Sequence, residues 1–591
     1  MKRKAPLILV IGILIFFSAC KDSMKVWIEP STERVMQFSA SKKTYLAEIC
    51  AAHNDYESFQ IVINGGANGL SNVNVTAGDL AGPGGAVIPS ANITLYREFY
   101  VHAAKPSFLY GVVGDLRLPG NYPDPLIPFT DPYDPAHPAV GAPFKVDKFK
   151  NQPVWVEVYI PEGIPAGLYS GKFTVTADNV KPAEIDVKAT VWNFSIPEQR
   201  TISTAFGLYY STEEKFHAAA TLSETLYNYE LELHRHRLDV TRITSFATNP
   251  FKFGGDGHLL AVDWSEYDSI MESRLNGSYY GDGTGMYKFN AGFFRPGSSG
   301  ALETKITDDQ YKEAAAEFAR HLKEKGWMNR VYVYCQDEPF WNNVPYEDLA
   351  HDIKLMLEAD PDWKGAFMVT NWWVKELDGL IDIWCPEVTK YEGWLTAGIL
   401  NFAGREEYDA MRLRGDQLWF YVCNATIPPY AGYDIDTMVG FEPRIMMWGA
   451  WYEKATGFLY WSTTAWKEVN PWEDPLAYPE FSRNGDGFLF YPGDHNGTAA
   501  PVGSPEEVSM NGPVTSIRLK QTRDGLEDWE MFKIAAGIAG ENAVKEAVSK
   551  AYTKLGTAPV LGIWNPLSPP WTRNGKVIDE VRKEVAALIT E

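Results

Sequence analysis

Eight short strand-like segments, most of them separated by helical segments, occupy the middle of this 591-residue chain. Each is rich in apolar, β-branched or aromatic residues, as expected of buried strands. In chain order they are Ala205–Tyr210, Leu238–Ile243, Met286–Phe293, Val331–Cys335, Ala366–Thr370, Ile381–Cys385, Leu418–Cys423 and Phe458–Trp461. Eight strands alternating with helices are typical of a (β/α)8 barrel of the TIM type, which we predict for residues 201–480.

The fourth segment, Val331–Cys335, is followed by two adjacent carboxylates, Asp337 and Glu338. Residues just past the carboxyl ends of barrel strands line the active site in this architecture. Like charges this close raise one pKa, which leaves one protonated acid beside a permanent anion, the division of labour that glycoside cleavage needs. The competing interpretation is a solvated turn that ends the strand before Pro339.

The regions on either side of the predicted barrel have other patterns. Residues 21–200 contain period-2 runs separated by turn residues and no long helix, which predicts an N-terminal β-sandwich. Within them, the Pro-, Asp- and Gly-rich stretch 119–143 predicts a long loop. For residues 481–591 the pattern predicts a small β/helical extension packed on the barrel, with a strand at 516–520 and a helix that begins near Arg523.

The first 20 residues have the three parts of a targeting segment. Lys2, Arg3 and Lys4 precede the apolar run 7–17, and small residues lead to Cys20. This resembles a bacterial lipoprotein signal peptide, with Cys20 as the lipidated residue. The alternative is an uncleaved membrane helix, but an eleven-residue run is shorter than the ~20 residues that a span requires. We therefore expect a lipid anchor in a bacterial cell envelope, in the periplasm or on the outer-membrane surface.

Charge and cysteine spacing narrow the possible partners. The net charge of −22 argues against binding nucleic acid, which depends on clustered Lys and Arg. The four later cysteines, Cys50, Cys335, Cys385 and Cys423, form no CxxC pair and are expected to be buried free thiols. Residues 484–494 could bind calcium, although their spacing does not match an EF-hand. We expect neither a metal nor an organic cofactor.

The strand ends supply amides and aromatics of the kind that bind a sugar, since aromatic rings stack on the sugar and amides bind hydroxyl groups. The predicted substrate-binding residues are Asn371, Trp372, Tyr391, Asn424 and Trp461.

The seventh strand ends without Asp or Glu, where a common retaining barrel glycosidase carries its nucleophile. A substrate 2-acetamido group could replace it by attacking the anomeric carbon to form an oxazoline. Glu338 would then be the acid/base, and Asp337 would orient the acetamido N–H. Glu387, after the sixth strand, remains a rival second carboxylate for a two-carboxylate mechanism.

Several motifs, spread over most of the chain, resemble those of glycoside hydrolase family 123 and its wider group of catalytic-domain relatives. They are Asn54-Asp55-Tyr56-Glu57-Ser58-Phe59-Gln60, Asp337-Glu338-Pro339, Trp448, Trp451, Gly457-Phe458-Leu459-Tyr460-Trp461, Gly485-Asp486-Gly487-Phe488-Leu489-Phe490-Tyr491-Pro492-Gly493, Ser516-Ile517-Arg518-Leu519 and Arg523-Asp524-Gly525-Leu526-Glu527-Asp528. The resemblance implies a sandwich followed by a barrel, and substrate-assisted catalysis by the Asp337–Glu338 pair.

The expected activity is release of terminal β-linked N-acetylgalactosamine (GalNAc) from glycans or glycolipid headgroups. The alternatives are another β-glycosidase specificity, such as a β-N-acetylglucosaminidase, and a non-catalytic surface glycan-binding lipoprotein. An intact acid pair argues against the last, because a binding module needs aromatics but no acid. The oligomeric state is not predicted.

Overall fold

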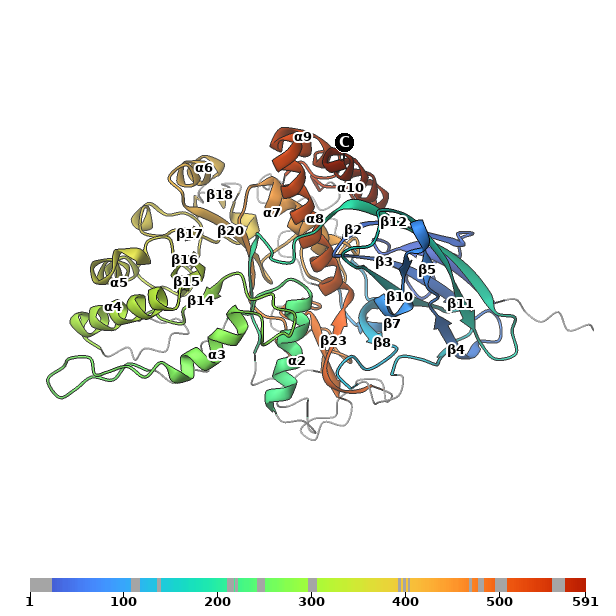
Figure 1. Cartoon of the computed structure of the whole chain (residues 1–591), viewed down its shortest axis with the longest axis horizontal. Helices are drawn as coiled ribbons and strands as arrows, with labels where there is room; N and C mark the ends of the chain where they lie inside the picture. The colour runs from blue at the N-terminus through green and yellow to red at the C-terminus, as the bar shows by residue number, and fades with distance from the viewer. Residues whose placement is uncertain are drawn as a thin grey trace, which may run out of the picture.

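The computed structural model of this chain describes the following residues: 24–107, 117–134, 140–209, 217, 222–241, 250–295, 306–391, 395–396, 400–401, 404–466, 470–476, 483–494, 508–554 and 569–590. The predicted signal peptide and Cys20 lie outside them. Figure 1 shows a β-sandwich at one end of the molecule, a barrel with helices outside it at the other, and helices α7 to α10 between them.

The N-terminal sandwich consists of two facing sheets. The first has the order β1 (Lys25–Pro30), β3 (Asp55–Asn64), β10 (Asn151–Ile160), β7 (Ile93–Ala103), β8 (Gly120–Pro128), β23 (Ser509–Ser516) and β22 (Phe490–Asp494). The second has the order β2 (Leu46–His53), β12 (Ala183–Ser195), β11 (Gly167–Thr176), β4 (Leu70–Thr76) and β9 (Phe144–Val146); β5 (Leu80–Ala81) also pairs with β11, and β6 (Val87–Ile88) pairs with β5. Alternate apolar residues of both sheets form one core.

The first sheet contains strands from both ends of the chain. β22 and β23, from the predicted C-terminal extension, continue it beyond β8. The prediction of a loop over residues 119–143 is therefore wrong in part, because Gly120–Pro128 forms β8 between β7 and β23. Pairing with a strand almost 400 residues later outweighs the turn-like local composition of this segment.

The barrel strands form one parallel sheet. Its order is β13 (Ser203–Phe206), β21 (Gly457–Tyr460), β20 (Gln417–Val422), β17 (Ile383–Trp384), β16 (Phe367–Thr370), β15 (Val331–Asp337) and β14 (Phe289–Asn290). Alternate residues such as Tyr332, Met368, Trp419 and Leu459 fill the interior. Val331 and Val333 belong instead to the larger core shared with the helices.

The second predicted strand, Leu238–Ile243, is reduced in the described residues to one parallel bridge between Val240 and Phe206. Residues 242 and 243 lie outside the described part. Between this bridge and β14, the Asp239 carboxylate accepts hydrogen bonds from the backbone N–H groups of Tyr287 (3.0 Å) and Lys288 (3.4 Å). A side chain thus takes the place of strand pairing here, and the residues that the structure describes form a nearly closed parallel barrel of seven strands, short of a complete eight-stranded ring.

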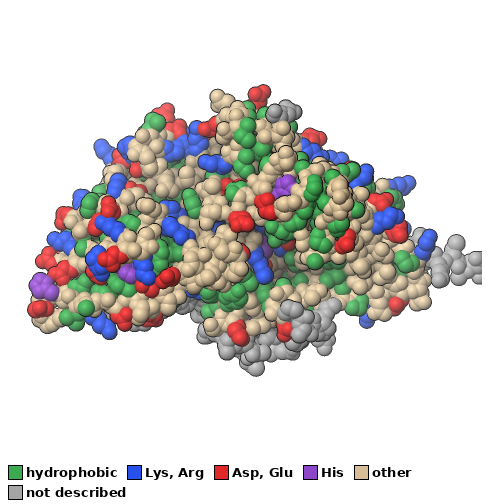
Figure 2. All heavy atoms as spheres, in the orientation of Figure 1, with side chains coloured by type: hydrophobic (Ala, Val, Ile, Leu, Met, Phe, Trp, Pro, Cys, Tyr) green, Lys and Arg blue, Asp and Glu red, His purple; other side chains and the backbone are tan. Residues whose placement is uncertain are grey.

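Helices cover the barrel and tie it to the sandwich. They are α2 (Leu222–Arg235), α3 (Ser265–Leu275), α4 (Asp308–Glu324), α5 (Tyr346–Ala359), α6 (Arg405–Leu413), α7 (Glu442–Tyr452), α8 (Ile517–Ala539), α9 (Glu541–Val548) and α10 (Gly575–Thr590); a small hairpin is made by β18 (Leu395–Thr396) and β19 (Leu400–Asn401). A capping box of Thr307 and Gln310 begins α4. Over α4 and α5, side chains of both charges intermingle at the surface (Figure 2). Among the described helices, none is both long and apolar enough to cross a membrane.

Helix α8 is the buried link between the two domains. It begins at Ile517, where the Ser516 hydroxyl accepts from the Leu519 N–H, so the strand predicted at 516–520 is wrong. Its charged residues are paired across the interface. Arg518 contacts Asp124, and Arg523 contacts Glu157, both on sandwich strands. Each arginine thus has a carboxylate partner, which offsets the free-energy cost of burying its charge.

Candidate active site

Strand β15 presents the two adjacent carboxylates at its carboxyl end. Asp337 is exposed and Glu338 is partly buried. Glu338 has a φ of +40°, in the left-handed region that non-glycine residues rarely adopt. Its backbone N–H donates to the Thr370 hydroxyl (3.0 Å) at the end of β16. This backbone conformation at Glu338 lets the two adjacent carboxylates occupy different surroundings. Strained backbone conformations of this kind are common at functional sites.

Asp337 is held by hydroxyl groups. Its Oδ1 accepts from the Tyr334 phenol (2.8 Å) and from the Thr370 hydroxyl (3.0 Å). Its backbone carbonyl accepts from the Asn342 amide (2.6 Å). The carboxylate is therefore fixed in orientation by neutral donors.

Glu338 is held by Tyr421, whose phenol donates to Oε1 from β20. Burial is the main cause that raises the pKa of Glu338 above its ordinary value. The negative charges of Asp337 and Glu387 raise this pKa further, while the Tyr421 hydrogen bond and Lys390 oppose the shift. Glu338 thus keeps its proton to a higher pH than an ordinary glutamate, as a general acid requires.

Two cavities flank Glu338, and they share Glu338, Thr370, Tyr421, Cys423 and Asn424 as lining residues. The first, of about 270 Å³, is also lined by Tyr209, Thr241, Tyr334, Asp337, Leu459, Tyr460, Trp461 and Asp486. We call it the Asp337 cavity. The second, of about 200 Å³, is also lined by Trp341, Asn371, Trp372, Glu387, Lys390 and Ala425. We call it the Trp341 cavity.

Four of the five predicted substrate-binding residues line these cavities. Trp461 lies in the Asp337 cavity, Asn371 and Trp372 lie in the Trp341 cavity, and Asn424 lies in both. Tyr391 lines neither cavity. It is buried against Tyr408 and Phe420, with the Arg405 guanidinium over its ring, so its surroundings are those of a packing residue.

Glu387 lines the Trp341 cavity, but its oxygens are already hydrogen-bonded. Oε2 accepts from the Thr389 backbone N–H (3.2 Å) and hydroxyl, and Oε1 accepts from the Thr426 hydroxyl (2.7 Å). Lys390 Nζ lies 3.8 Å from Oε2. Glu387 therefore connects the segment after β17 to the loop after β20.

Sequence reasoning missed Tyr421, Trp341 and Asp486. Alternation along β20 places Trp419 and Tyr421 in the barrel interior, and that pattern could have found Tyr421. Asp486 comes from the segment after β21. It is buried, and its Oδ1 accepts from Tyr460 (3.2 Å) and Trp461 (3.4 Å). Burial raises the pKa of Asp486 to about 6.

The cysteines and the possible metal ligands carry no separate chemistry in the described residues. Cys335 and Cys385 are buried, Cys50 and Cys423 are partly buried, and all four are free thiols. The buried pair agrees with the expected core role, and burial raises the pKa of both thiols.

Across the described ranges, no group of three or more His, Cys, Asp or Glu side chains could hold a metal ion.

The comparison with solved structures supports this fold. A family 123 glycoside hydrolase from Clostridium perfringens, from a structural analysis of glycolipid glycan hydrolysis, aligns over 96% of this chain and 97% of its own, with a TM-score of 0.65 and 17% identity. A GH5 xyloglucanase from Bacteroides ovatus has 9% identity and a TM-score of 0.26, covering 83% of this chain and 99% of its own. A family 39 glycoside hydrolase from Bacteroides cellulosilyticus has 11% identity and a TM-score of 0.32, covering 77% and 80%. These last two similarities are too low to bear on the fold.

Family models match both halves of the architecture. The glycoside hydrolase 123 N-terminal domain matches residues 39–177, and the glycoside hydrolase 123 catalytic domain matches residues 295–535. A search among curated proteins finds no significant match. Since the two matches together span more than half of the sequence, the chain belongs to glycoside hydrolase family 123.

Proposed function

We propose that this glycoside hydrolase is an exo-acting, retaining β-N-acetylgalactosaminidase that uses the substrate's own acetamido group as nucleophile. The observation that carries the proposal is the arrangement of the adjacent carboxylates. Glu338 has a raised pKa and lies between two cavities, while Asp337 is exposed and lines one of them. Glu338 can therefore act as an acid, while the Asp337 side chain can accept a hydrogen bond from the substrate in the adjoining cavity.

In the first step, protonated Glu338 gives its proton to the glycosidic oxygen. The acetamido oxygen attacks the anomeric carbon as the bond to the leaving group breaks, which forms an oxazolinium ring. Asp337 accepts a hydrogen bond from the acetamido N–H and stabilises the positive charge that develops there. In the second step, the Glu338 carboxylate removes a proton from water, which attacks the anomeric carbon and opens the ring. Two inversions give retention.

The positions of the two cavities support a placement for each half of the substrate. The group beside Asp337 must be the acetamido sugar, so the sugar occupies the Asp337 cavity, where Trp461 offers a ring face and Asp486 an acceptor for hydroxyl groups. The leaving group then lies on the other side of Glu338, in the Trp341 cavity. Trp341 and Trp372, with ring centroids 6.3 Å apart, offer aromatic surface to a second sugar ring. The enzyme is thus suited to removing a terminal sugar from a longer glycan.

The natural substrates we propose are terminal β-linked GalNAc on glycans or glycolipid headgroups. The Clostridium perfringens structure of the same family comes from work on glycolipid glycan hydrolysis. A lipid anchor on Cys20, as the first 20 residues predict, would hold the enzyme at an envelope surface.

A two-carboxylate mechanism with Glu387 is the second candidate, because Glu387 lines the Trp341 cavity. Its oxygens are occupied by Thr389 and Thr426, and its cavity lies on the leaving-group side in our assignment. Both observations favour the acetamido mechanism.

The test uses the form lacking residues 1–20 with matched aryl β-glycosides of GalNAc, N-acetylglucosamine and galactose. Cleavage of the GalNAc compound alone, with β-GalNAc as the first product seen by NMR, is the expected result. A thiazoline analogue of GalNAc, which imitates the oxazoline, should inhibit. Cleavage of the galactose compound at a similar rate would rule out the acetamido mechanism. Preference for N-acetylglucosamine would change the specificity only. Absence of turnover with retained glycan binding would favour a binding protein.

A further inference from the structure

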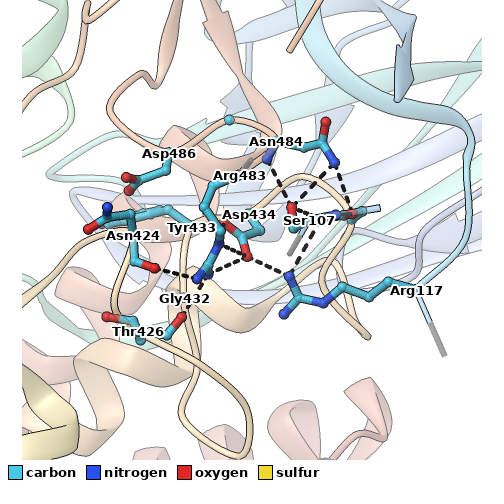
Figure 3. Close-up of polar contacts among 12 residues, drawn as sticks. Ser107, Arg117, Asn424, Thr426, Gly432, Tyr433, Asp434, Arg483, Asn484 and Asp486 are labelled. Carbon is cyan, nitrogen blue, oxygen red and sulfur yellow. Dashed lines mark hydrogen bonds and ion pairs between the residues drawn. The ribbon is translucent and has the colours of Figure 1, made fainter. Parts of the chain in front are cut away.

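A buried arginine, Arg483, holds the loop that forms one wall of both cavities. Its Nη1 donates to the backbone carbonyl of Asn424 (2.6 Å) and its Nη2 to that of Thr426 (2.7 Å). These carbonyls bracket Ala425, which lines the Trp341 cavity, and Asn424 lines both cavities. Figure 3 shows the Arg483 guanidinium between these two carbonyls and Asp434. One buried side chain therefore holds two backbone carbonyls of the loop that follows β20.

Asp434 fixes the orientation of Arg483. Its two carboxylate oxygens accept from Arg483 Nε at 3.1 and 3.0 Å, and Arg117 Nη1 donates to Oδ2 from the β7–β8 connection of the sandwich. Burial alone would raise the pKa of Asp434, but the two guanidiniums outweigh it and bring this pKa below its ordinary value. Asp434 is thus a buried anion shared by one cation from the barrel side and one from the sandwich.

A second contact from the sandwich fixes the segment that carries Asp486. The Ser107 N–H and hydroxyl each donate to Asp436 at 2.7 Å. The Asn484 N–H donates to the Ser107 hydroxyl at 2.9 Å, and its side-chain amide donates to Asp436 at 3.0 Å. Asn484 lies between Arg483 and Asp486, so this contact positions the buried carboxylate of the Asp337 cavity. Figure 3 shows Asn424 and Asp486 on the same side of the cluster.

We infer that Arg483 is a positioning residue for the sugar site, and that the sandwich, through Arg117 and Ser107, takes part in holding that site. The inference rests on the proposed function, since it concerns binding of the sugar beside Asp337. None of these three residues lines either cavity. They act through Asn424 and Asp486, which makes the N-terminal domain a contributor to substrate affinity as well as a brace.

The test compares Arg483→Met, Arg483→Lys and Arg117→Met in the form lacking residues 1–20, with an aryl β-GalNAc substrate. Arg483→Met should raise KM about tenfold or more while kcat changes less than about threefold, because the loop moves but Glu338 and Tyr421 do not. Arg483→Lys should lie between, since one ammonium cannot reach both carbonyls and Asp434. Arg117→Met should raise KM by a smaller factor. The Ki of the GalNAc thiazoline should rise in parallel with KM.

The matched control is Arg523→Met. It breaks another buried ion pair between the sandwich and the rest of the chain, with Glu157, but touches neither the loop nor a cavity-lining residue of the site. It should lower Tm and leave KM unchanged. An unchanged KM in Arg483→Met, or an equal KM increase in Arg523→Met, would overturn the inference. Inactive wild-type enzyme on GalNAc compounds would instead count against the proposed function, so the two failures are distinguishable.

Discussion

The Tyr421 phenol donates a hydrogen bond to Oε1 of Glu338 across the barrel, from β20 to β15. β20 is the seventh predicted strand, whose end lacks Asp and Glu. Tyr421 on this strand points into the barrel and donates to Glu338, the acid/base residue that we propose, from a strand that carries no second carboxylate at its end. The hydrogen bond fixes one oxygen of Glu338 and partly offsets the burial that raises its pKa. Substitutions of the residues around Glu338 should therefore change its pKa.

Glu338→Gln should lose most turnover on substrates with poor leaving groups. General acid catalysis contributes about 10²- to 10⁴-fold, and a sugar leaving group needs the proton most. A dinitrophenyl glycoside should be cleaved with a much smaller loss in the first step. Rates on the two substrates, measured by single-turnover kinetics, check this. Equal losses on both would contradict the acid role of Glu338.

Two neighbours of Glu338 should move the pH dependence in opposite directions. The first step needs protonated Glu338, so kcat/KM falls as pH rises through the pKa of this residue. Glu387 raises this pKa, and the Tyr421 hydrogen bond lowers it. Glu387→Gln should therefore move the alkaline limb of the kcat/KM profile to lower pH, and Tyr421→Phe should move it to higher pH. Complete loss of turnover in Glu387→Gln, with the fold intact, would instead favour the two-carboxylate mechanism.

Trp341→Ala should distinguish glycans from simple aryl glycosides. Trp341 is about half exposed and lines the proposed leaving-group side. Loss of an aromatic contact worth about 1 kcal/mol should lower kcat/KM roughly fivefold on a GalNAc-terminated oligosaccharide. The methyl β-glycoside of GalNAc, which has no second ring, should be unaffected. The matched variant Trp461→Ala removes a wall of the sugar cavity and should impair both substrates. An equal effect of Trp341→Ala on both would refute the cavity assignment.

Glu98 on β7 should make stability depend on pH. Its side chain is buried, and neither carboxyl oxygen has a hydrogen-bond partner among the described residues. Burial raises its pKa from 4.5 to about 8. The folded state therefore binds more protons than the unfolded state between these values, and the stability contributed by this group falls as pH rises through that window. Glu98→Gln should gain about 3 kcal/mol relative to wild type between pH 5 and pH 8.

Urea unfolding at several pH values measures this difference. The exposed control Glu48→Gln should leave the pH dependence unchanged. A constant difference between Glu98→Gln and wild type across the range would show that Glu98 is not protonated at neutral pH in the folded protein.

Periodicity located the barrel strands well, because alternation and strand ends are local properties of the chain. Asp337 and Glu338 were predicted as a catalytic pair because they follow a strand end directly, where a parallel barrel opens its site, and the structure places both in the lining of one cavity. Tyr391 packs against Tyr408 and Phe420 and lines neither cavity, because a few residues of loop path decide whether a side chain returns to the mouth. Trp341 was not predicted because nothing in its local sequence distinguishes a cavity wall from a surface turn. Asp486 was noted only as part of a motif and of a possible calcium segment, since its contact with the cavity depends on how that segment packs.

The amino-acid sequence by itself determined the order of sandwich and barrel, the position of Asp337 and Glu338, and the family. These depend on residue spacing and on motifs within short stretches. Only the tertiary structure decided that Tyr421 reaches Glu338, that β22 and β23 complete the N-terminal sheet, and that Arg117 shares Asp434 with Arg483. Each of these pairs residues that are roughly 50 to 400 positions apart in sequence. Such contacts are set by how buried donors and acceptors are satisfied when the domains pack, and no local pattern encodes that choice.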